Sequence, residues 1–320
     1  MSHFRSGPVA PGIAFITGGA RGLGNAIAVS FAKEGSKGIA LIDIQNEDTF
    51  QKGKAEVEKF GAKVITIHAD VTKEDQVQAA IDQTVKEFGR IDYAANFAGI
   101  VGPLAMSWDI SLEEYRKVID VNLVGVWLCT KLELKQMLKQ SSIDVEEGRV
   151  PQQGSIVNAA SVNSIQAGAA TTGYTAAKHG VVGITKAASL EGRGNNIRVN
   201  CVSPGFLQTD LLKPAMKTGE LPETVWKVYE KRQGRVANFE EVGDVVVCLS
   251  TPRFSLVNGH NLVIDGYVLW SRLRRGVADQ TLEDLQSMRT QSEQCLGRRL
   301  RIAMGAGLRS FVFSSLFTHQ

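Results

Sequence analysis

A tyrosine and a lysine four residues apart are the side chains best suited to acid–base chemistry in this sequence. Tyr174 and Lys178 have the spacing that places a phenol and an ammonium on one face of a helix. A free phenol has a pKa near ~10 and is a weak base at neutral pH, but a neighbouring ammonium favours the phenolate. A tyrosine stacked on the stem of a surface lysine is the structural alternative. The pair therefore predicts a general acid/base only if other catalytic groups accompany it.

A glycine-rich turn is the second chemical signal. Residues 17–24 read Thr-Gly-Gly-Ala-Arg-Gly-Leu-Gly, directly after an apolar strand pattern and at the start of a helical one. Glycines there allow a tight turn and close approach to a pyrophosphate, whose charge lies at the positive helix N-terminus. A plain helix start is the alternative. The context of the turn, a strand before it and an acidic residue after the next strand, favours a dinucleotide site.

The acidic residue is Asp43, which lies 19 residues after Gly24 (43 − 24) at the end of the next predicted strand. This is the position from which a carboxylate hydrogen-bonds the adenosine ribose. A carboxylate repels a 2′-phosphate, so the sequence favours NAD over NADP. Arg21 argues the other way, because a cation in the turn could pair with a 2′-phosphate.

The elements that must position these residues alternate between short Val- and Ile-rich runs and longer helical patterns. That alternation is typical of βαβ units. It predicts an α/β fold, a Rossmann-type doubly wound parallel sheet of seven strands in a single domain. The predicted strands are 12–17, 38–43, 63–68, 91–95, 155–159, 197–203 and 261–265. Helices are predicted from residue 23, at 46–60, 73–88, within 111–140, and at 171–193 and 240–249.

Several motifs in combination resemble the classical short-chain dehydrogenase/reductase family, over roughly residues 10 to 270. They are the turn at 17–24, Asn96-Phe97-Ala98-Gly99, Asn122, Ser161, Tyr174, Lys178 and Pro204-Gly205. The resemblance implies a catalytic tetrad. Tyr174 is then the general acid/base, with its pKa lowered by Lys178 and by an oxidised cofactor. Ser161 hydrogen-bonds the substrate oxygen, Lys178 also holds the nicotinamide ribose, and Asn122 anchors a water that relays the proton.

The same resemblance implies further cofactor contacts. Asp70 matches the residue that contacts the adenine amino group, and a helix N-cap is its alternative. Thr209 matches a loop residue that binds the carboxamide, and helix capping competes there too. Phe97 departs from the commoner Asn. The complete set of predicted cofactor-binding residues is Gly18, Arg21, Gly22, Leu23, Gly24, Asp43, Asp70, Val71, Asn96, Gly99, Tyr174, Lys178, Pro204, Gly205 and Thr209.

Apolar residues near these motifs suit a bulky, weakly charged alcohol or ketone, although the same residues could form core. They are Val162, Ile165, Phe206, Leu207, Leu211, Leu212 and Trp226. The resemblance also implies a homodimer or homotetramer, and weakly suggests secondary metabolites as substrates.

Composition excludes several other classes. Four separated cysteines and five scattered histidines predict no metal site. Residues 271–320 carry eight arginines and four acidic residues, so residues 1–270 have a net charge of −1 within a chain of +3. The main body therefore lacks the basic footprint of a nucleic-acid binder. No apolar run is long enough to span a membrane and no signal peptide is evident, so we expect a cytoplasmic protein.

Residues 1–270 are thus expected to form the catalytic domain, and 271–320 a basic extension of uncertain structure. A disordered appendage is favoured there over a surface anchor. The predicted function is interconversion of a secondary alcohol and a ketone with NAD(H). The alternatives are an NADPH-dependent biosynthetic ketoreductase and a non-catalytic nucleotide sensor with the same fold.

Overall fold

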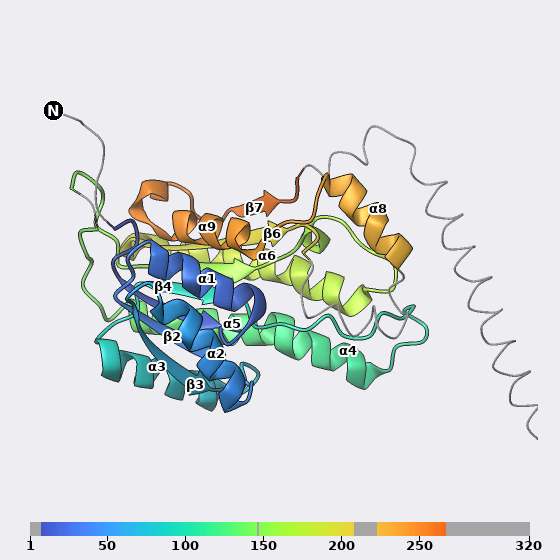
Figure 1. Ribbon diagram of the computed structural model, residues 1–320, viewed down its shortest axis with the longest axis horizontal. Helices are drawn as coiled ribbons and strands as arrows, with labels where there is room; N and C mark the ends of the chain where they lie inside the picture. The colour runs from blue at the N-terminus through green and yellow to red at the C-terminus, as the bar shows by residue number, and fades with distance from the viewer. Residues whose placement is uncertain (1–7, 146, 208–222, 267–320) are drawn as a thin grey trace, which may run out of the picture. The chain divides into compact units, whose positions relative to one another are not determined.

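A seven-stranded, all-parallel sheet forms the centre of the protein (Figure 1). The computed structural model describes residues 8–145, 147–207 and 223–266. The strand order is β3-β2-β1-β4-β5-β6-β7. Between β1 and β4 the order in which the chain adds strands switches from one side of β1 to the other, as in a doubly wound sheet. The predicted fold is therefore confirmed. The strands are β1 (Ile13–Thr17), β2 (Gly38–Asp43), β3 (Lys63–His68), β4 (Tyr93–Asn96), β5 (Gly154–Ala159), β6 (Ile197–Pro204) and β7 (Asn261–Ile264).

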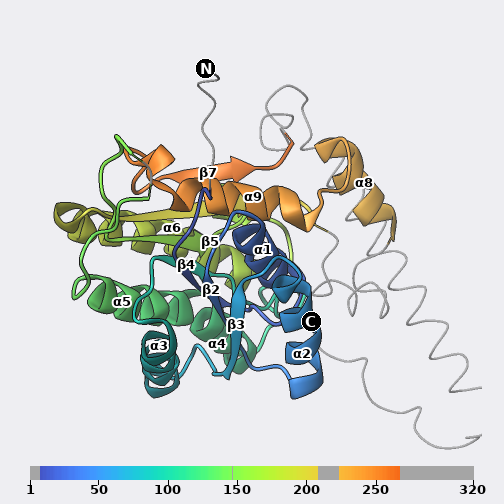
Figure 2. The same ribbon diagram turned by 60° about the vertical axis from the view of Figure 1, so that its left-hand side comes forward.

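Helices cover both faces of the sheet, as the two views in Figures 1 and 2 show. One face packs against α1, α2 and α9, and the other against α3, α5 and α6. The helix bounds are α1 (Gly22–Lys33), α2 (Glu47–Glu58), α3 (Glu74–Phe88), α4 (Leu112–Ile119), α5 (Gly125–Met137), α6 (Thr172–Gly192), α8 (Glu223–Gln233) and α9 (Phe239–Ser250).

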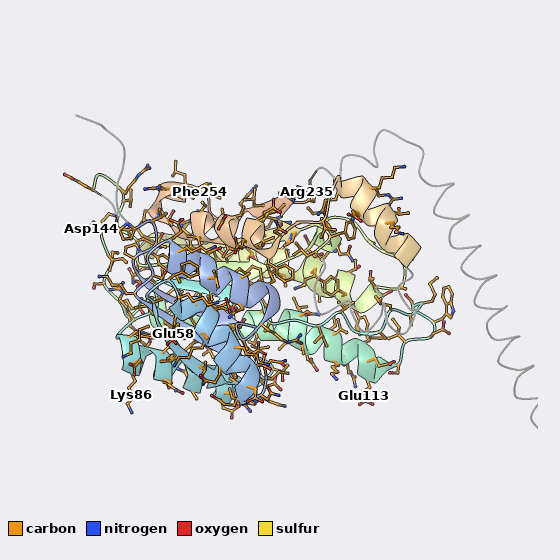
Figure 3. The ribbon with its side chains drawn as sticks, in the orientation of Figure 1. Glu58, Lys86, Glu113, Asp144, Arg235 and Phe254 are labelled. Carbon is orange, nitrogen blue, oxygen red and sulfur yellow. The ribbon has the colours of Figure 1, made fainter. Side chains whose placement is uncertain are left out.

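Burial on both faces explains the continuous apolar strands. In β1, Ala14 and Ile16 enter the core beneath α1, whereas Phe15 enters the core beneath α3 and α5. Alternate side chains of a strand point to opposite faces, so a strand covered twice needs apolar residues at every position. Charged helix residues such as Lys86 and Glu113 point away from the sheet (Figure 3).

Local chemistry sets several helix ends. The side chain of Asn46 accepts a hydrogen bond from Thr49 N at the start of α2, and Ser111 and Glu114 form a reciprocal capping box at the start of α4. Gly89, with φ of 84°, ends α3 in the left-handed conformation. These signals lie in the sequence, which is why the predicted bounds fall close to the observed ones.

The helix predicted within 111–140 is not one regular α-helix. A π-helical turn at Asp120–Val124 separates α4 from α5, and Gly125 N bonds Asp120 O across it. Hydrophobic periodicity does not report such a turn, because one wide turn hardly changes the pattern of buried residues. Asn122 lies within it. Single wide turns of this kind are frequent at functional sites.

Two expectations from the sequence concern the domain boundary near residue 270 and membrane-spanning segments. The predicted boundary at 270 and the extension 271–320 lie outside the described residues. Among the described residues, no helix has both the length and the apolar character that a bilayer crossing requires.

Candidate active site

The four predicted catalytic residues come from three different elements. Asn122 lies in the π-helical turn, Ser161 follows β5, and Tyr174 and Lys178 lie on α6. The carboxyl ends of parallel strands face one edge of a sheet, where ligands bind in open α/β folds. The chain therefore directs all four toward the same edge.

Lys178 is the most constrained of the four. Its side chain is 4% exposed, and its Nζ donates to Ala159 O at 2.7 Å. The same Nζ lies 5.5 Å from the centre of the Tyr174 ring. Burial disfavours the charged ammonium and lowers the pKa of Lys178 to about 8. The ammonium of Lys178 therefore gives up its proton more readily than that of an exposed lysine.

Tyr174 is held next to Ser161, whose side chain hydrogen-bonds the phenol. Burial raises the pKa of Tyr174 above the usual value, and the bond from Ser161 opposes that rise. Burial and Ser161 set this pKa in the chain by itself, and the prediction that Lys178 and an oxidised cofactor together lower it concerns the site with the nucleotide bound. Ser161 also accepts a bond from Asn163 N at 3.2 Å, which fixes its side chain.

Asn122 has both ends of its amide engaged with one residue. Its Nδ2 donates to Ile100 O at 2.7 Å, and its Oδ1 accepts from Ile100 N at 2.9 Å. Gly99 lies against it, because a Cβ there would come 2.7 Å from Asn122 Oδ1 and 4.0 Å from Lys178 Nζ. The predicted Gly99 is therefore the close-approach point that lets the segment after β4 reach two members of the tetrad.

The glycine turn wraps tightly between β1 and α1. Gly18 has φ of 69°, and a Cβ there would lie 2.8 Å from Phe97 O. A Cβ on Gly24 would lie 2.2 Å from Gly18 O. Gly22 differs from both: its φ is 60°, but a Cβ would meet nothing within 4 Å. Gly18 and Gly24 are needed for packing, whereas Gly22 borders open space at the start of the helix.

The start of α1 has the features of an anion site. Arg21 is the N-cap residue and its side chain makes no capping bond, and the first turn, which includes Leu23, contains no acidic residue. The first N–H groups of a helix need acceptors. A pyrophosphate can supply them, so the turn fits the dinucleotide that the sequence predicts.

Asp43 lies beside this turn at the end of β2. Its Oδ2 accepts from Ala20 N at 3.2 Å and its Oδ1 accepts from Ile44 N at 2.8 Å. Each carboxylate oxygen keeps further acceptor capacity. The half-buried carboxylate is thus fixed where the ribose is predicted to bind.

Asp70 does not cap α3, so the N-cap alternative is wrong. Its Oδ1 accepts from Thr72 N and Thr72 Oγ1, at 2.9 and 2.8 Å. The N-cap residue of α3 is Lys73, which makes no side-chain capping bond. Val71 is buried in the core and packs on Gly125, where a Cβ would come 2.9 Å from Val71 Cγ2. Because the Val71 side chain is in the core, Asp70 and Val71 can contact a nucleotide only through their main chain and the Asp70 carboxylate.

Asn96 is also placed differently from a ligand-facing residue. It is fully buried, and its Nδ2 donates to Glu133 Oε2 and Asn158 Oδ1. Its side chain therefore points into the protein, and only its main chain leads toward the predicted adenosine side. Pro204 ends β6, and Gly205 N bonds Ile264 O at 2.8 Å. Thr209 lies outside the described residues.

Comparisons with known proteins agree with this geometry. A family model described as enoyl-(acyl carrier protein) reductase matches residues 18–267. Levodione reductase from Leifsonia aquatica is 37% identical over 261 residues, covering 79% of this chain and 92% of the relative. Zerumbone synthase from Zingiber zerumbet is 37% identical over 264 residues, covering 79% and 93%. A crystal structure of levodione reductase has a TM-score of 0.73 at 34% identity, covering 81% of this chain and 97% of that one.

The chain belongs to the classical short-chain dehydrogenase/reductase family. Relatives named as dehydrogenases and reductases, borneol dehydrogenase from Lavandula x intermedia among them at 34% identity, make it an oxidoreductase acting on CH–OH groups. The alignment with borneol dehydrogenase covers 80% of this chain and 90% of the relative.

Two further residues, not predicted from the sequence, shape the site of this short-chain dehydrogenase/reductase. Gln233, at the end of α8, accepts from Phe206 N at 2.7 Å and donates to Phe206 O at 3.0 Å and to Arg235 O. Glu133 lies buried behind Asn96. A carboxylate at a buried position of α5, among Leu132, Leu134 and Met137, was the available signal for Glu133. Nothing in the sequence near Gln233 indicates its partners.

The apolar residues proposed to line a substrate divide into two groups. Val162 and Leu207 are buried, which favours the core interpretation for them. Ile165 is exposed and Phe206 is half-buried, so both remain available to a ligand. Leu211 and Leu212 lie outside the described residues, and the side chain of Trp226 is not among those described.

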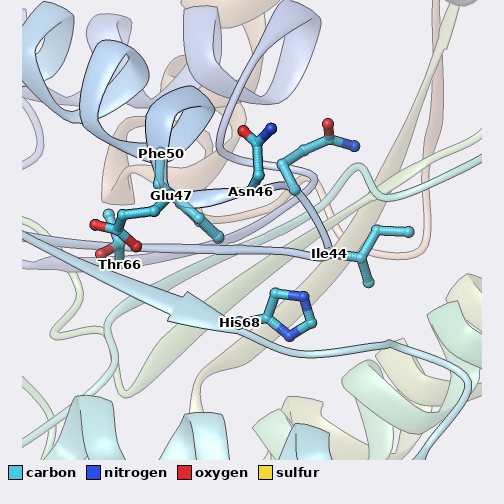
Figure 4. Close-up of a pocket in the computed structure, with 7 residues that line it drawn as sticks. Ile44, Asn46, Glu47, Phe50, Thr66 and His68 are labelled. Carbon is cyan, nitrogen blue, oxygen red and sulfur yellow. The ribbon is translucent and has the colours of Figure 1, made fainter.

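A cavity of about 350 Å³ lies at another part of this short-chain dehydrogenase/reductase. Ile44, Gln45, Asn46, Glu47, Phe50, Thr66 and His68 line it (Figure 4). It lies at the β3 edge of the sheet, and β1 and β4 separate β2 from β5, the strand that Ser161 follows. The cavity is therefore distinct from the place where the tetrad gathers.

Proposed function

We propose that this protein interconverts a secondary alcohol and a ketone by hydride transfer with NAD(H), on a bulky and weakly charged substrate. The observation that carries the proposal is the convergence of Tyr174 with Ser161 and Lys178, and of Gly99 with Asn122 and Lys178. A nucleotide sensor would need the glycine turn but has no use for a buried acid–base pair.

The residues of the chain divide the acid–base work between them. In reduction, Tyr174 gives its phenolic proton to the oxygen of the ketone, and in oxidation it accepts the proton of the alcohol. The Ser161 hydroxyl donates to the same substrate oxygen and stabilises the charge that develops on it. A bound nicotinamide dinucleotide supplies or accepts the hydride.

Lys178 and Asn122 support the proton transfer. The Lys178 ammonium lies over the Tyr174 ring, where its charge would favour the phenolate, and it could hold a ribose hydroxyl of the nucleotide. Asn122 holds the segment at Ile100 and shapes the space where a relaying water is expected. With both amide atoms on the Ile100 main chain, it fixes that segment rather than moving a proton itself.

The described residues fit a dinucleotide. The uncapped start of α1 and the open space at Gly22 suit the pyrophosphate, with Gly18 and Gly24 keeping the turn close. Asp43 suits the adenosine ribose and supports NAD over NADP, because its fixed carboxylate repels a 2′-phosphate. Asp70, Val71, Asn96, Gly99, Pro204, Gly205 and Thr209 complete the proposed cofactor set. An NADPH-dependent ketoreductase, with Arg21 pairing the phosphate, is the alternative that a cofactor comparison tests.

The substrate class is proposed from two kinds of support. Exposed Ile165 and half-buried Phe206 offer apolar surface beside Ser161 and β6. Relatives are named for zerumbone, borneol and levodione, which supports a bulky alcohol or ketone of secondary metabolism for this chain as well.

We also propose that the protein is a homo-oligomer, a dimer or a tetramer. Large apolar side chains stay exposed along α4, α5 and α6: Leu112, Trp127, Leu138 and Leu190. Covering such side chains with a second copy removes apolar area from water. Light scattering after size-exclusion chromatography measures the mass, and a monomer would contradict this proposal.

Turnover measurements test the proposed reaction. A panel of bulky secondary alcohols and ketones is assayed with NAD(H) and with NADP(H) by the absorbance of the reduced nicotinamide, with Tyr174→Phe as control. Turnover that depends on Tyr174 and prefers NAD(H) is expected. A preference for NADP(H) would favour the ketoreductase alternative. Tight nucleotide binding without any turnover across the panel would favour the sensor.

A further inference from the structure

Helix α5 carries an acidic side chain, Glu133, that is buried between the helix and the sheet. Glu133 is fully buried, between the apolar residues Leu132, Leu134 and Met137 of the same helix. Acidic side chains are almost never fully buried without a partner. Glu133 plays no part in the acid–base chemistry proposed above, so its presence needs another reason.

Glu133 belongs to a chain of buried polar groups that crosses four elements. Asn96 Nδ2 donates to Glu133 Oε2 at 2.9 Å and to Asn158 Oδ1 at 3.0 Å. Thr130 Oγ1 donates to the same Asn158 Oδ1, and Asn158 Nδ2 donates to Thr185 Oγ1 at 3.1 Å. All five residues are at most 2% exposed. The chain thus links α5, the last residue of β4, β5 and α6.

Two atoms of this chain have no donor: Glu133 Oε1 and Asn96 Oδ1. They belong to the two residues that already share a hydrogen bond. A primary amide and a carboxylic acid pair through two bonds at once, N–H to the acid carbonyl and acid O–H to the amide oxygen. One proton on Glu133 Oε1 would therefore supply the donor that both orphan atoms need, without disturbing the bond to Asn158.

The charged and titratable groups around Glu133 do not offer it a cation. On α5, Cys129 is a buried thiol whose pKa the Glu133 carboxylate helps to raise, and Lys131 pairs with Glu74 of α3 at the surface. Lys178 of α6 donates instead to Ala159 O. β4 and β5 present the amides of Asn96 and Asn158. Burial raises the pKa of Glu133 to about 8, opposed only by the bond from Asn96.

The buried chain ends next to both halves of the active site. Asn96 directly precedes the Phe97–Gly99 segment, and the residue after it, Ile100, holds both ends of the Asn122 amide. Asn158 directly precedes Ala159, whose carbonyl accepts from Lys178 Nζ. A shift of Asn96 or Asn158 would therefore move the main-chain groups that hold two members of the tetrad.

We propose that Glu133 is a neutral carboxylic acid in the folded protein and that, paired with Asn96, it is a positioning residue for Asn122 and Lys178. The pair fixes the ends of β4 and β5 relative to α5, and both of its side chains are fully buried. The protonation stands on the buried hydrogen bonds alone, whereas the effect on turnover rests on the function proposed above.

The experiment compares Glu133→Gln with Glu133→Leu in the full-length protein. Glutamine has the shape of the protonated acid, and its amide can give and accept the same two bonds with Asn96. Leucine leaves both Asn96 contacts empty. Glu113→Gln, which replaces an exposed carboxylate on α4, is the matched control. Infrared spectra near neutral pH, urea unfolding between pH 5 and 9, and turnover are measured for each.

The sign of the pH effect follows from proton linkage. An acid with a raised pKa in the folded state contributes stability that is fully present below its unfolded pKa and is lost as the pH rises through the folded value. The wild type should therefore lose stability relative to Glu133→Gln as the pH rises from 5 to about 8, with a constant difference above that.

We expect a protonated-carboxyl infrared band in the wild type and in Glu113→Gln that is missing from Glu133→Gln. We also expect Glu133→Gln to keep turnover within about twofold, and Glu133→Leu to lose at least tenfold where it folds. No such band, together with parallel pH curves for the wild type and Glu133→Gln, would overturn the neutral acid. The band with equal turnover in all variants would overturn the positioning role alone. Neither readout of protonation needs turnover, so a failure of the proposed reaction would be recognised separately.

Discussion

The turn after β1 and the interior behind β4 and β5 both shape the carboxyl edge of the sheet, but they use different parts of the chain. In the turn, the shape depends on the main chain and on the absence of side chains. Gly18 and Gly24 allow close packing, Gly22 borders open space, and the Asp43 carboxylate holds the main chain at Ala20. Behind β4 and β5, buried side chains do it, with Asn96, Asn158 and Glu133 joined by hydrogen bonds.

The difference predicts how the two regions fail. A change at Gly22 in the turn should alter nucleotide affinity and leave the acid–base groups in place, because a Cβ there would meet no protein atom within 4 Å. A change around Tyr174 and Lys178 should alter turnover and its pH dependence, because buried polar groups respond to the loss of a single hydrogen bond. The following substitutions test that division, from the largest expected effect to the smallest.

Tyr174→Phe should lower kcat by about a thousandfold while nucleotide affinity stays within about threefold. Removing a general acid/base costs ~10²–10⁴ in rate. Steady-state assays and calorimetric titration of the nucleotide measure the two quantities. Tyr93→Phe, which removes a phenol at the far end of β4, should keep wild-type turnover. Equal turnover of Tyr174→Phe and the wild type would end the proposed mechanism.

Lys178→Met should lose about a hundredfold in kcat and gain stability. Because burial lowers the pKa of Lys178 from 10.5 to about 8, the buried ammonium costs at most about 3 kcal/mol, partly offset by its bond to Ala159 O. A lowered amine pKa means that the deficit is present in full below pH 8 and disappears as the pH rises toward 10.5. Unfolding curves at pH 7 and pH 10 should therefore show a gain for the variant that shrinks at the higher pH. An unchanged or lower stability at pH 7 would contradict the buried-charge argument.

Gly22→Ala should weaken nucleotide binding at least tenfold without unfolding the protein. The strain of an alanine at φ of 60° costs about 1–2 kcal/mol, and its methyl group would enter the open space assigned to the pyrophosphate. Gly89→Ala is the matched control, because it too has a positive φ and nothing within 4 Å of a Cβ. Similar loss of Tm in both, with loss of affinity only in Gly22→Ala, is the expected pattern. Equal nucleotide affinities of Gly22→Ala and Gly89→Ala would contradict a pyrophosphate site at Gly22.

Asp43→Asn should lower the preference for NAD over NADP by about tenfold, measured as the ratio of the two kcat/KM values. The asparagine oxygen can still accept from Ala20 N, so the loop stays in place while the charge is removed. Asp48→Asn, an exposed carboxylate on α2, serves as control. An unchanged ratio in Asp43→Asn would show that this carboxylate does not select the cofactor.

Gln233→Ala should have the smallest effect, a rise of about three- to tenfold in KM for the ketone with kcat nearly constant. The variant loses the two bonds that hold the Phe206 main chain and so loosens an apolar residue beside the proposed substrate. Gln78→Ala on the surface of α3 controls for the loss of an amide. A drop in kcat with constant KM would instead place Gln233 among the groups that act on the transition state.

Local patterns were sufficient for much of the fold. The strands appear where Val and Ile runs were found, and the glycine turn lies between β1 and α1 as its spacing requires. Patterns failed where a distant partner decides the outcome. The π-helical turn at Asn122 is one case, since its wide turn brings the side chain to Ile100. Asp70 is a failure of a local pattern instead, because its carboxylate bonds Thr72, two residues away, and does not cap α3.

The sequence by itself determined the order of the strands and helices, the glycine turn, the position of Asp43 and the residues from which the tetrad is drawn. Those features depend on neighbours within a few residues, or on a backbone conformation that only glycine adopts readily. Only the tertiary structure decided that Asn96 faces inward, that Lys178 bonds Ala159 O and that Glu133 lies buried beside an amide. Each of these depends on which strands and helices pack together, and a buried polar group takes its protonation and its partners from that packing.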